Sequence, residues 1–167
     1  MLLSIAGFAL FREVSPTGPV AARDLPRPQK PAKPAFTPAE EAYIQALWPI
    51  HGQVERSAAR MALGQIFYTI NELDRPSLKK RIDDALLTYR RSEARLRELT
   101  PPASIQRDHE EYLSAIELFQ KSAVEVLRMF EDGREEHMLA AYPLGQKATD
   151  KIREVGGKFW PNEFAPN

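Results

Sequence analysis

One stripe of side chains constrains the fold of this chain more than any other feature. Eight residues between positions 105 and 130 follow one another at spacings of four, three, four, three, four, three and four. All but one of them are apolar or aromatic. They are Ile105, His109, Tyr112, Ile116, Phe119, Ala123, Val126 and Phe130. This heptad spacing is typical of a long amphipathic helix that packs along its length against other helices. The stripe predicts an architecture and does not identify a reaction.

Three further helical segments accompany this one. The first begins at Thr37–Glu40, a capping box with proline at the first helical position. The second follows the break at 74–77 and ends before Pro101-Pro102, because a residue that precedes proline avoids helical geometry. The helix that carries the heptad stripe ends at 132–133, and the fourth ends at 156–157, a pair of glycines.

The first helix carries an apolar stripe that the fold is expected to bury. The predicted inward residues are Tyr43, Leu47, Ile50, Val54, Ala58 and Met61, extended to about Leu73 by Ile66, Phe67 and Ile70. Short connections between helices favour antiparallel neighbours, and no sustained period-two alternation suggests a strand. We therefore predict an all-α fold, an antiparallel up-down-up-down four-helix bundle over residues 37–167.

The N-terminal region has a different character. Within residues 1–14, the run Leu2–Phe11 carries no charge. A membrane span needs about 20 apolar residues, so this run has the length of a signal-peptide core instead. Val20-Ala21-Ala22 offers small residues for a cleavage after Ala22, although no Lys or Arg precedes the apolar run. We expect export or an N-terminal anchor, hence a periplasmic or membrane-tethered protein; the alternative is a frayed apolar tail on a cytoplasmic protein.

Residues 15–36 form a linker rich in proline and basic residues. It holds six prolines with four Lys or Arg residues between them. Such a composition favours polyproline II or disorder, because it offers no apolar surface to bury. The expected role is a basic stalk that holds the folded domain away from a membrane.

Composition excludes several classes of function. Basic and acidic residues balance at 23 each, without the basic excess of a nucleic-acid-binding protein. Cysteine is absent, which excludes disulfides, thiolate metal sites and a cysteine nucleophile. No nucleophile elbow or phosphate-binding loop is present, so the sequence favours a protein that is not an enzyme.

Charge differs between the second and third helices. The second is basic outside its apolar stripe and the third is acidic. Helices of opposite charge attract one another and fix their pairing order, which is the favoured interpretation. The alternative is a basic surface on the second helix that meets an anionic membrane or polymer.

Two histidines are candidates for a metal or haem site. Counted along the predicted helices, His51 and His109 lie at about the same level of the bundle, whereas His137 lies near the opposite end. No Glu precedes any of them by three residues, as the di-iron carboxylate pattern requires. We therefore predict no cofactor, a buried His109 hydrogen-bonded to a neighbour, and a surface His51.

Two prolines lie inside predicted helices. Pro49 and Pro143 are expected to bend or split the first and fourth helices. The alternative is that they widen the interior of the bundle enough to admit a ligand. Beyond the fourth helix the aromatic residues Phe159, Trp160 and Phe164 are expected to fold back onto the bundle end and are candidates for an interaction surface.

One segment is similar to a pattern in other proteins. Leu96–Leu99, the Pro101-Pro102 step and the run His109–Leu113 resemble uncharacterised exported bacterial helical bundles, in which a leucine-rich helix, a Pro-Pro step and a His-containing helix follow one another. The resemblance implies an exported bundle and no catalytic residues. We expect an interaction or structural module of the bacterial cell envelope with an unidentified partner and oligomeric state. A ligand-binding or sensory bundle, or a metal- or haem-binding bundle, is the alternative.

Overall fold

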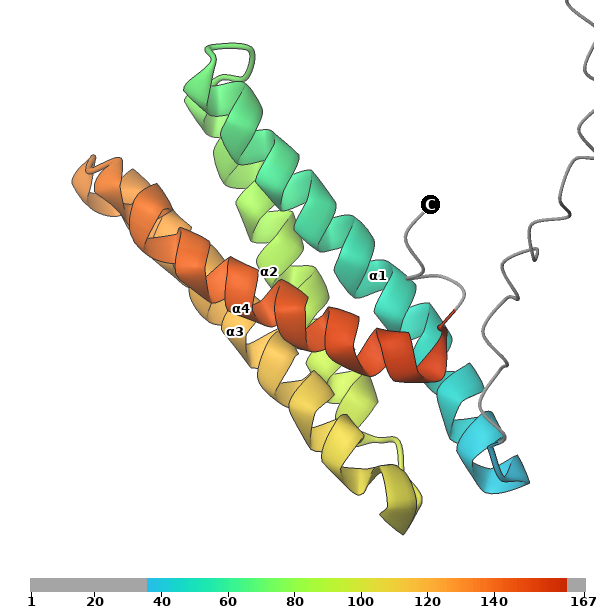
Figure 1. Ribbon diagram of the computed structural model, residues 1–167. Coiled ribbons are helices and arrows are strands. Elements are labelled where there is room, and N and C mark those ends of the chain that lie inside the picture. Colours follow the sequence, from blue (N-terminus) through green and yellow to red (C-terminus); the bar gives the residue numbers. More distant parts are fainter. Residues whose placement is uncertain (1–35, 162–167) are drawn as a thin grey trace, which may run out of the picture. The chain divides into compact units, whose positions relative to one another are not determined.

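The computed structural model describes residues 36–161, and over this range the chain folds into four α-helices (Figure 1). They are α1 (Pro38–Thr69), α2 (Arg75–Arg97), α3 (Gln106–Asp132) and α4 (Glu136–Phe159), with a short 3-10 turn at Ala103–Ile105 before α3. The described range contains no strand, and the predicted all-α four-helix bundle is confirmed. The segment 1–14, nearly all of the linker and Phe164 lie outside it. Within 36–161, no helix combines the length and the apolar character that crossing a membrane requires.

Local sequence signals set three of the eight helix ends. Thr37 and Glu40 form the predicted capping box, with the Thr37 hydroxyl accepting from the Glu40 backbone N–H at 3.3 Å. Asp74 caps α2 by accepting from the Ser77 backbone N–H at 2.7 Å. Gly133 ends α3 in the left-handed region at φ 83°, a conformation that costs a residue with a Cβ about 1 kcal/mol or more.

Two sequence signals do not interrupt their helices. Pro49 and Pro143 lie inside α1 and α4, and each helix continues past its proline. The glycines at 156–157, predicted to end the fourth helix, lie within α4, which runs on to Phe159. Gly156 and Phe159 are buried, so packing of this last turn outweighs the weak helix propensity of glycine.

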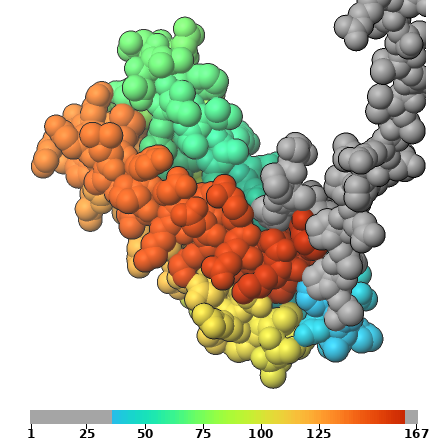
Figure 2. Space-filling view, in the orientation of Figure 1, coloured from blue at the N-terminus to red at the C-terminus, as the bar shows by residue number. Residues whose placement is uncertain are grey.

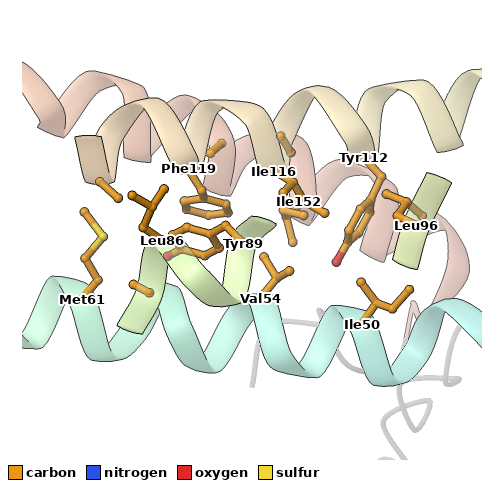
Figure 3. Close-up of a cluster of buried hydrophobic side chains, with 14 of the residues drawn as sticks. Ile50, Val54, Met61, Leu86, Tyr89, Leu96, Tyr112, Ile116, Phe119 and Ile152 are labelled. Carbon is orange, nitrogen blue, oxygen red and sulfur yellow. The ribbon is translucent and has the colours of Figure 1, made fainter. Parts of the chain in front are cut away.

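The predicted stripe on α3 lies at the centre of the core. Seven of its eight residues are buried, and Phe130 packs partly buried at the edge. Figure 3 shows Tyr112, Ile116 and Phe119 pointing from α3 towards Val54 and Ile50 of α1 and Leu86 of α2. The stripe therefore packs against other helices along its length, as its spacing predicts.

The four helices do not pack equally against one another. Extensive contacts join α1 to α2, α2 to α3 and α3 to α4, whereas α1 and α4 meet over only a small area. In Figure 1, α1 and α4 are closest near the C-terminal end of α4 and separate towards the two turns at 70–74 and 133–135. The bundle is thus open along one of its four seams.

Ion pairs only partly follow the predicted attraction between the second and third helices. Arg97 of α2 lies 3.1 Å from Glu117 of α3 (Nη2 to Oε1). The other acidic residues of α3 that pair between helices face α4 instead: Lys158 lies 2.7 Å from Asp108, and Lys151 pairs with Glu111. Acidic residues on α3 therefore hold α4 more than α2.

A single truncation tests how much of the stability this core supplies. Ile116→Ala removes a fully buried side chain at the middle of the α3 stripe and leaves a cavity. We expect it to lower the free energy of unfolding by about 2–5 kcal/mol, measured by urea denaturation. The control is Leu87→Ala on the outer face of α2, where the side chain is 48% exposed. Similar losses in the two variants would contradict a core organised on α3.

Candidate functional site

The open seam contains a groove of about 470 Å³ between α1 and α4. Its walls are rich in small residues, Ala58, Ala59 and Ala62 from α1 with Ala141 and Gly145 from α4. Small side chains keep the two helices from filling the space between them. A volume of this size lies within the usual range of ligand pockets, about 300–1,000 Å³.

The floor of the groove is aromatic. Tyr89 of α2 and Phe119 of α3 stack with ring centroids 5.1 Å apart and planes 15° apart (Figure 3). The Tyr89 hydroxyl is buried and has no hydrogen-bond partner among the described residues. Burial raises the pKa of Tyr89 far above its usual value, so the phenol stays protonated. The floor is therefore apolar, and the Tyr89 hydroxyl is buried beneath it.

Other polar groups of the groove are at its walls and rim. The Ser122 hydroxyl donates to the Ala141 carbonyl at 3.0 Å and so joins α3 to α4. A Cβ added at Gly145 would come within 3.3 Å of the Ser122 hydroxyl oxygen, which explains the glycine at that position. Glu55 and Arg153 lie at the rim with opposite charges.

A second, wider recess of about 1,020 Å³ continues the groove towards the two turns. Gln65 and Tyr142 line both recesses. Figure 2 shows this face of the molecule, with α1 in green to teal and α4 in orange to red. Exposed apolar side chains line the wider recess: Ile66 and Ile70 from α1, with Leu139 and Tyr142 from α4.

The α1 stripe departs here from its predicted burial. Ile66, Phe67 and Ile70 were expected to be inward, yet they are 54%, 38% and 56% exposed. Earlier members of the same stripe, such as Val54 and Met61, are buried. The difference arises because α4 moves away from α1 towards the turns and does not cover this face of the last turns of α1.

Carboxylates surround the wider recess. Glu72, Asp74, Glu135 and Glu136 line it, and Arg75 is the one basic residue in its lining. The Arg75 guanidinium donates to the Met129 carbonyl at 2.6 Å and lies 5.4 Å from the centre of the Phe130 ring, so it is directed into the protein. This end of the groove therefore combines exposed apolar side chains with an acidic rim.

The two candidate histidines lie in the core and contact tyrosines rather than each other. A hydrogen bond of 2.8 Å joins His109 Nδ1 to Tyr43 Oη, and one of 2.9 Å joins His51 Nδ1 to Tyr112 Oη. Both connect α1 to α3. The prediction of a buried, hydrogen-bonded His109 is confirmed, whereas the prediction of a surface His51 is wrong, because His51 is 2% exposed.

The surroundings of His51 favour its neutral form. Burial lowers its pKa to about 4, even though the Glu55 carboxylate lies 3.3 Å from Nε2. Burial also lowers the pKa of His109. Within residues 36–161 no group of three His, Asp or Glu side chains is arranged to hold a metal ion. These histidines therefore act as buried hydrogen-bonding groups.

His137 has a separate structural role. Its ring nitrogens lie 2.8 Å from Glu125 and 2.9 Å from Asp132, across the turn from α3 to α4. The hydrogen bond to Asp132, and then that to Glu125, raises the pKa of His137. It therefore fixes the α3–α4 turn beside the groove and, as the sequence predicted, lies far from the other two histidines.

The aromatic residues proposed as an interaction surface are mostly packed. Phe159 is 2% exposed and contacts Phe36 and Tyr43 edge-on, so it belongs to the core and is not a surface residue. Trp160 is partly buried, with its ring 4.6 Å from that of His51 and 4.9 Å from that of Trp48. Phe164 lies outside the described residues. The sequence did not predict a groove between α1 and α4. Its signals there were Pro143, offered only as an alternative, and small residues, which are three alanines of α1 with Ala141 and Gly145 of α4.

Comparisons of the chain with protein-family models, with curated proteins and with solved structures give no match. The resemblance to exported helical bundles therefore stays a prediction.

Two tyrosines at similar depth offer a matched test of the groove floor. Tyr89→Phe removes a buried hydroxyl that has no protein partner, and we expect a free energy of unfolding that is unchanged or higher by about 1 kcal/mol. Tyr112→Phe removes a hydroxyl bonded to His51, and we expect a loss of about 1 kcal/mol. Urea denaturation of both variants measures the difference. Equal losses would indicate that the Tyr89 hydroxyl has a stabilising partner.

The buried His51 predicts acid sensitivity. Its pKa is about 4 when folded and about 6.5 when unfolded, so the unfolded state binds more protons between these values. Stability contributed by neutral His51 is therefore complete above pH 6.5 and decreases towards pH 4, by an amount on the order of 1–3 kcal/mol. We expect His51→Gln to flatten the slope of unfolding free energy against pH in this window. An unchanged slope would show that the pKa of His51 is the same in the folded and unfolded states.

Proposed function

We propose that this protein is a non-enzymatic interaction module of the bacterial cell envelope that binds an apolar segment of a partner in the α1–α4 groove. The observation that carries the proposal is the uncovered end of the α1 stripe. Ile66 and Ile70 continue a core pattern, yet they face Leu139 and Tyr142 across an open recess. Large apolar side chains exposed together are typical of interaction sites.

The chemistry of the groove supports binding rather than catalysis. Its lining is dominated by alanine, glycine, aliphatic and aromatic residues. The Ser122 hydroxyl is used in a bond to the α4 backbone, and neither buried histidine is among the lining residues. This site can therefore bind a partner through shape complementarity and apolar contacts.

The proposed location depends on the N-terminal sequence. The uncharged run Leu2–Phe11 and the proline-rich basic stretch at 15–36 support export or anchoring of the folded domain. We expect fractionation of the native host to recover the protein with membranes or the periplasm. Recovery of the full-length chain in the cytosol alone would contradict this part of the proposal.

A small-molecule ligand is the second candidate. The narrower recess, of about 470 Å³, has a mostly apolar lining, which favours an apolar molecule. Pro143 lies between Tyr142 and the glycine at 145, both of which line this recess. The position of Pro143 therefore supports the alternative of a ligand site beside a proline.

A neutral peptide tests the groove directly. The probe is a fluorescent 16-residue helical peptide with Leu at spacings of three and four and Gln and Ala elsewhere. We expect binding to the wild-type protein at micromolar concentrations, followed by fluorescence anisotropy. Leu139→Asp places a charge in the recess and should weaken binding at least tenfold, because a charge must then be desolvated on binding.

The control for this substitution is Leu87→Asp. It makes the same change on the outer face of α2, at a side chain that does not line the groove and is also exposed. We expect it to leave the affinity unchanged, and circular dichroism should show both variants folded. Binding that is absent in the wild type, or equally weakened by both variants, would contradict the proposed function.

A further inference from the structure

The length, shape and charge of the open seam point to one kind of occupant. We infer that the partner segment is a basic amphipathic helix of about 16 residues, which lies along the seam as a fifth helix of the bundle with its positive charges beside the two turns. This inference rests on the proposed function and adds the chemical identity of the partner segment.

The length follows from the lining residues. The two recesses share Gln65 and Tyr142 and together extend along α1 from Val54 to Ile70. At a rise of about 1.5 Å per residue, this stretch is about 24 Å long. A helix of about 16 residues has the same length.

The shape of the walls favours a helix. The exposed anchors are four residues apart on α1 (Ile66 and Ile70) and three apart on α4 (Leu139 and Tyr142), which is one helical turn on each side. A helix between them can insert its apolar stripe against both rows. Small residues on both walls, three alanines of α1 with Ala141 and Gly145 of α4, deepen the middle of the groove and give room for large side chains of that stripe.

The charge distribution identifies the polar face of the partner. Around the recess at the turns, the carboxylates of Glu72, Asp74, Glu135 and Glu136 outnumber two arginines. The guanidinium of Arg75 is directed inward, and Arg134 lies 3.9 Å from Glu136. At the other end of the groove, Glu55 and Arg153 offset each other. A helix with Lys or Arg near one end therefore complements the site, and an acidic helix would be repelled.

The same charges argue against two other occupants. An anionic membrane surface would meet four carboxylates at the edge of the recess. A second copy that docked through the same recess would bring two sets of these carboxylates together. Binding of either occupant in the recess would overturn the inference.

The experiment uses three peptides with the full-length protein. They share the Leu positions of the neutral probe and differ at four polar positions near one end, which carry Lys, Gln or Glu. Circular dichroism is used to match their helix content. At low ionic strength we expect the Lys peptide to bind at least tenfold more tightly than the Gln peptide, and the Glu peptide to bind more weakly than both. Added salt should reduce the difference between the Lys and Gln peptides.

A charge-neutralised variant connects this preference to the recess. The triple substitution Glu72→Gln, Glu135→Gln and Glu136→Gln keeps the side-chain size and should reduce the advantage of the Lys peptide to less than threefold. It should leave the affinity for the Gln peptide unchanged. The matched control, Asp83→Asn, Asp84→Asn and Glu98→Gln, removes two carboxylates of α2 and that of its C-cap residue. All three lie outside the groove lining, and the control should keep the Lys preference.

The possible failures are distinguishable. Equal binding of the Lys and Gln peptides, weakened by Leu139→Asp, would overturn the basic partner and leave the proposed function standing. No binding of any peptide would overturn both. Binding to phosphatidylglycerol vesicles that Leu139→Asp abolishes would overturn the inference and identify a membrane surface as the occupant of the recess. Self-association in analytical ultracentrifugation that Leu139→Asp abolishes would overturn the inference and identify a second copy of this chain as the occupant.

Discussion

Burial of the α3 stripe is the constraint on which the rest of the structure depends. A helix in a four-helix bundle has two direct neighbours and one diagonal neighbour, and α3 has its main contacts with α2 and α4. Because Tyr112, Ile116 and Phe119 fill the centre, the other helices arrange themselves around this row. The chain closes three of the four seams in this way. The fourth seam, between α1 and α4, has no comparable row of large side chains on both sides and stays open along much of its length.

Two buried Tyr–His hydrogen bonds determine which end of that seam closes. Tyr43 with His109 and His51 with Tyr112 connect α1 to α3 across the core, near the end where α4 finishes. Buried polar pairs contribute modest net stability, but leaving one partner unpaired is costly, so such pairs favour one register of packing. Phe159 then packs against Tyr43 and closes this end. Towards the turns the bond across the seam is an exposed one, from the Tyr68 hydroxyl to Glu135 at the start of α4 at 2.8 Å, and the seam widens into the apolar recess.

The sequence predicts this fold well because heptad spacing reports which face of a helix is buried. It predicts the groove poorly, because spacing does not report whether a partner helix is present. Ile66 and Ile70 carry the same periodic signal as Met61, and only the divergence of α4 leaves them exposed. His51 lies on the edge of its stripe, where periodicity is ambiguous, and its burial depends on Tyr112 from a helix 61 residues away in sequence. The glycine at position 156 favours a helix end locally, and the burial of Gly156 and Phe159 in the core outweighs this preference.

The groove combines features that do not favour a bundle folding alone. Filling the seam with larger side chains at the alanines, or with an apolar residue at Tyr89, would increase packing and remove an unpartnered hydroxyl. Exposed Leu139, at 77%, and Ile66 likewise contribute little to the isolated domain. The proposed occupant of the seam would change this balance, because it would bury these exposed side chains. Under the proposed function, the packing that the free protein lacks along this seam would contribute to the affinity for the bound segment.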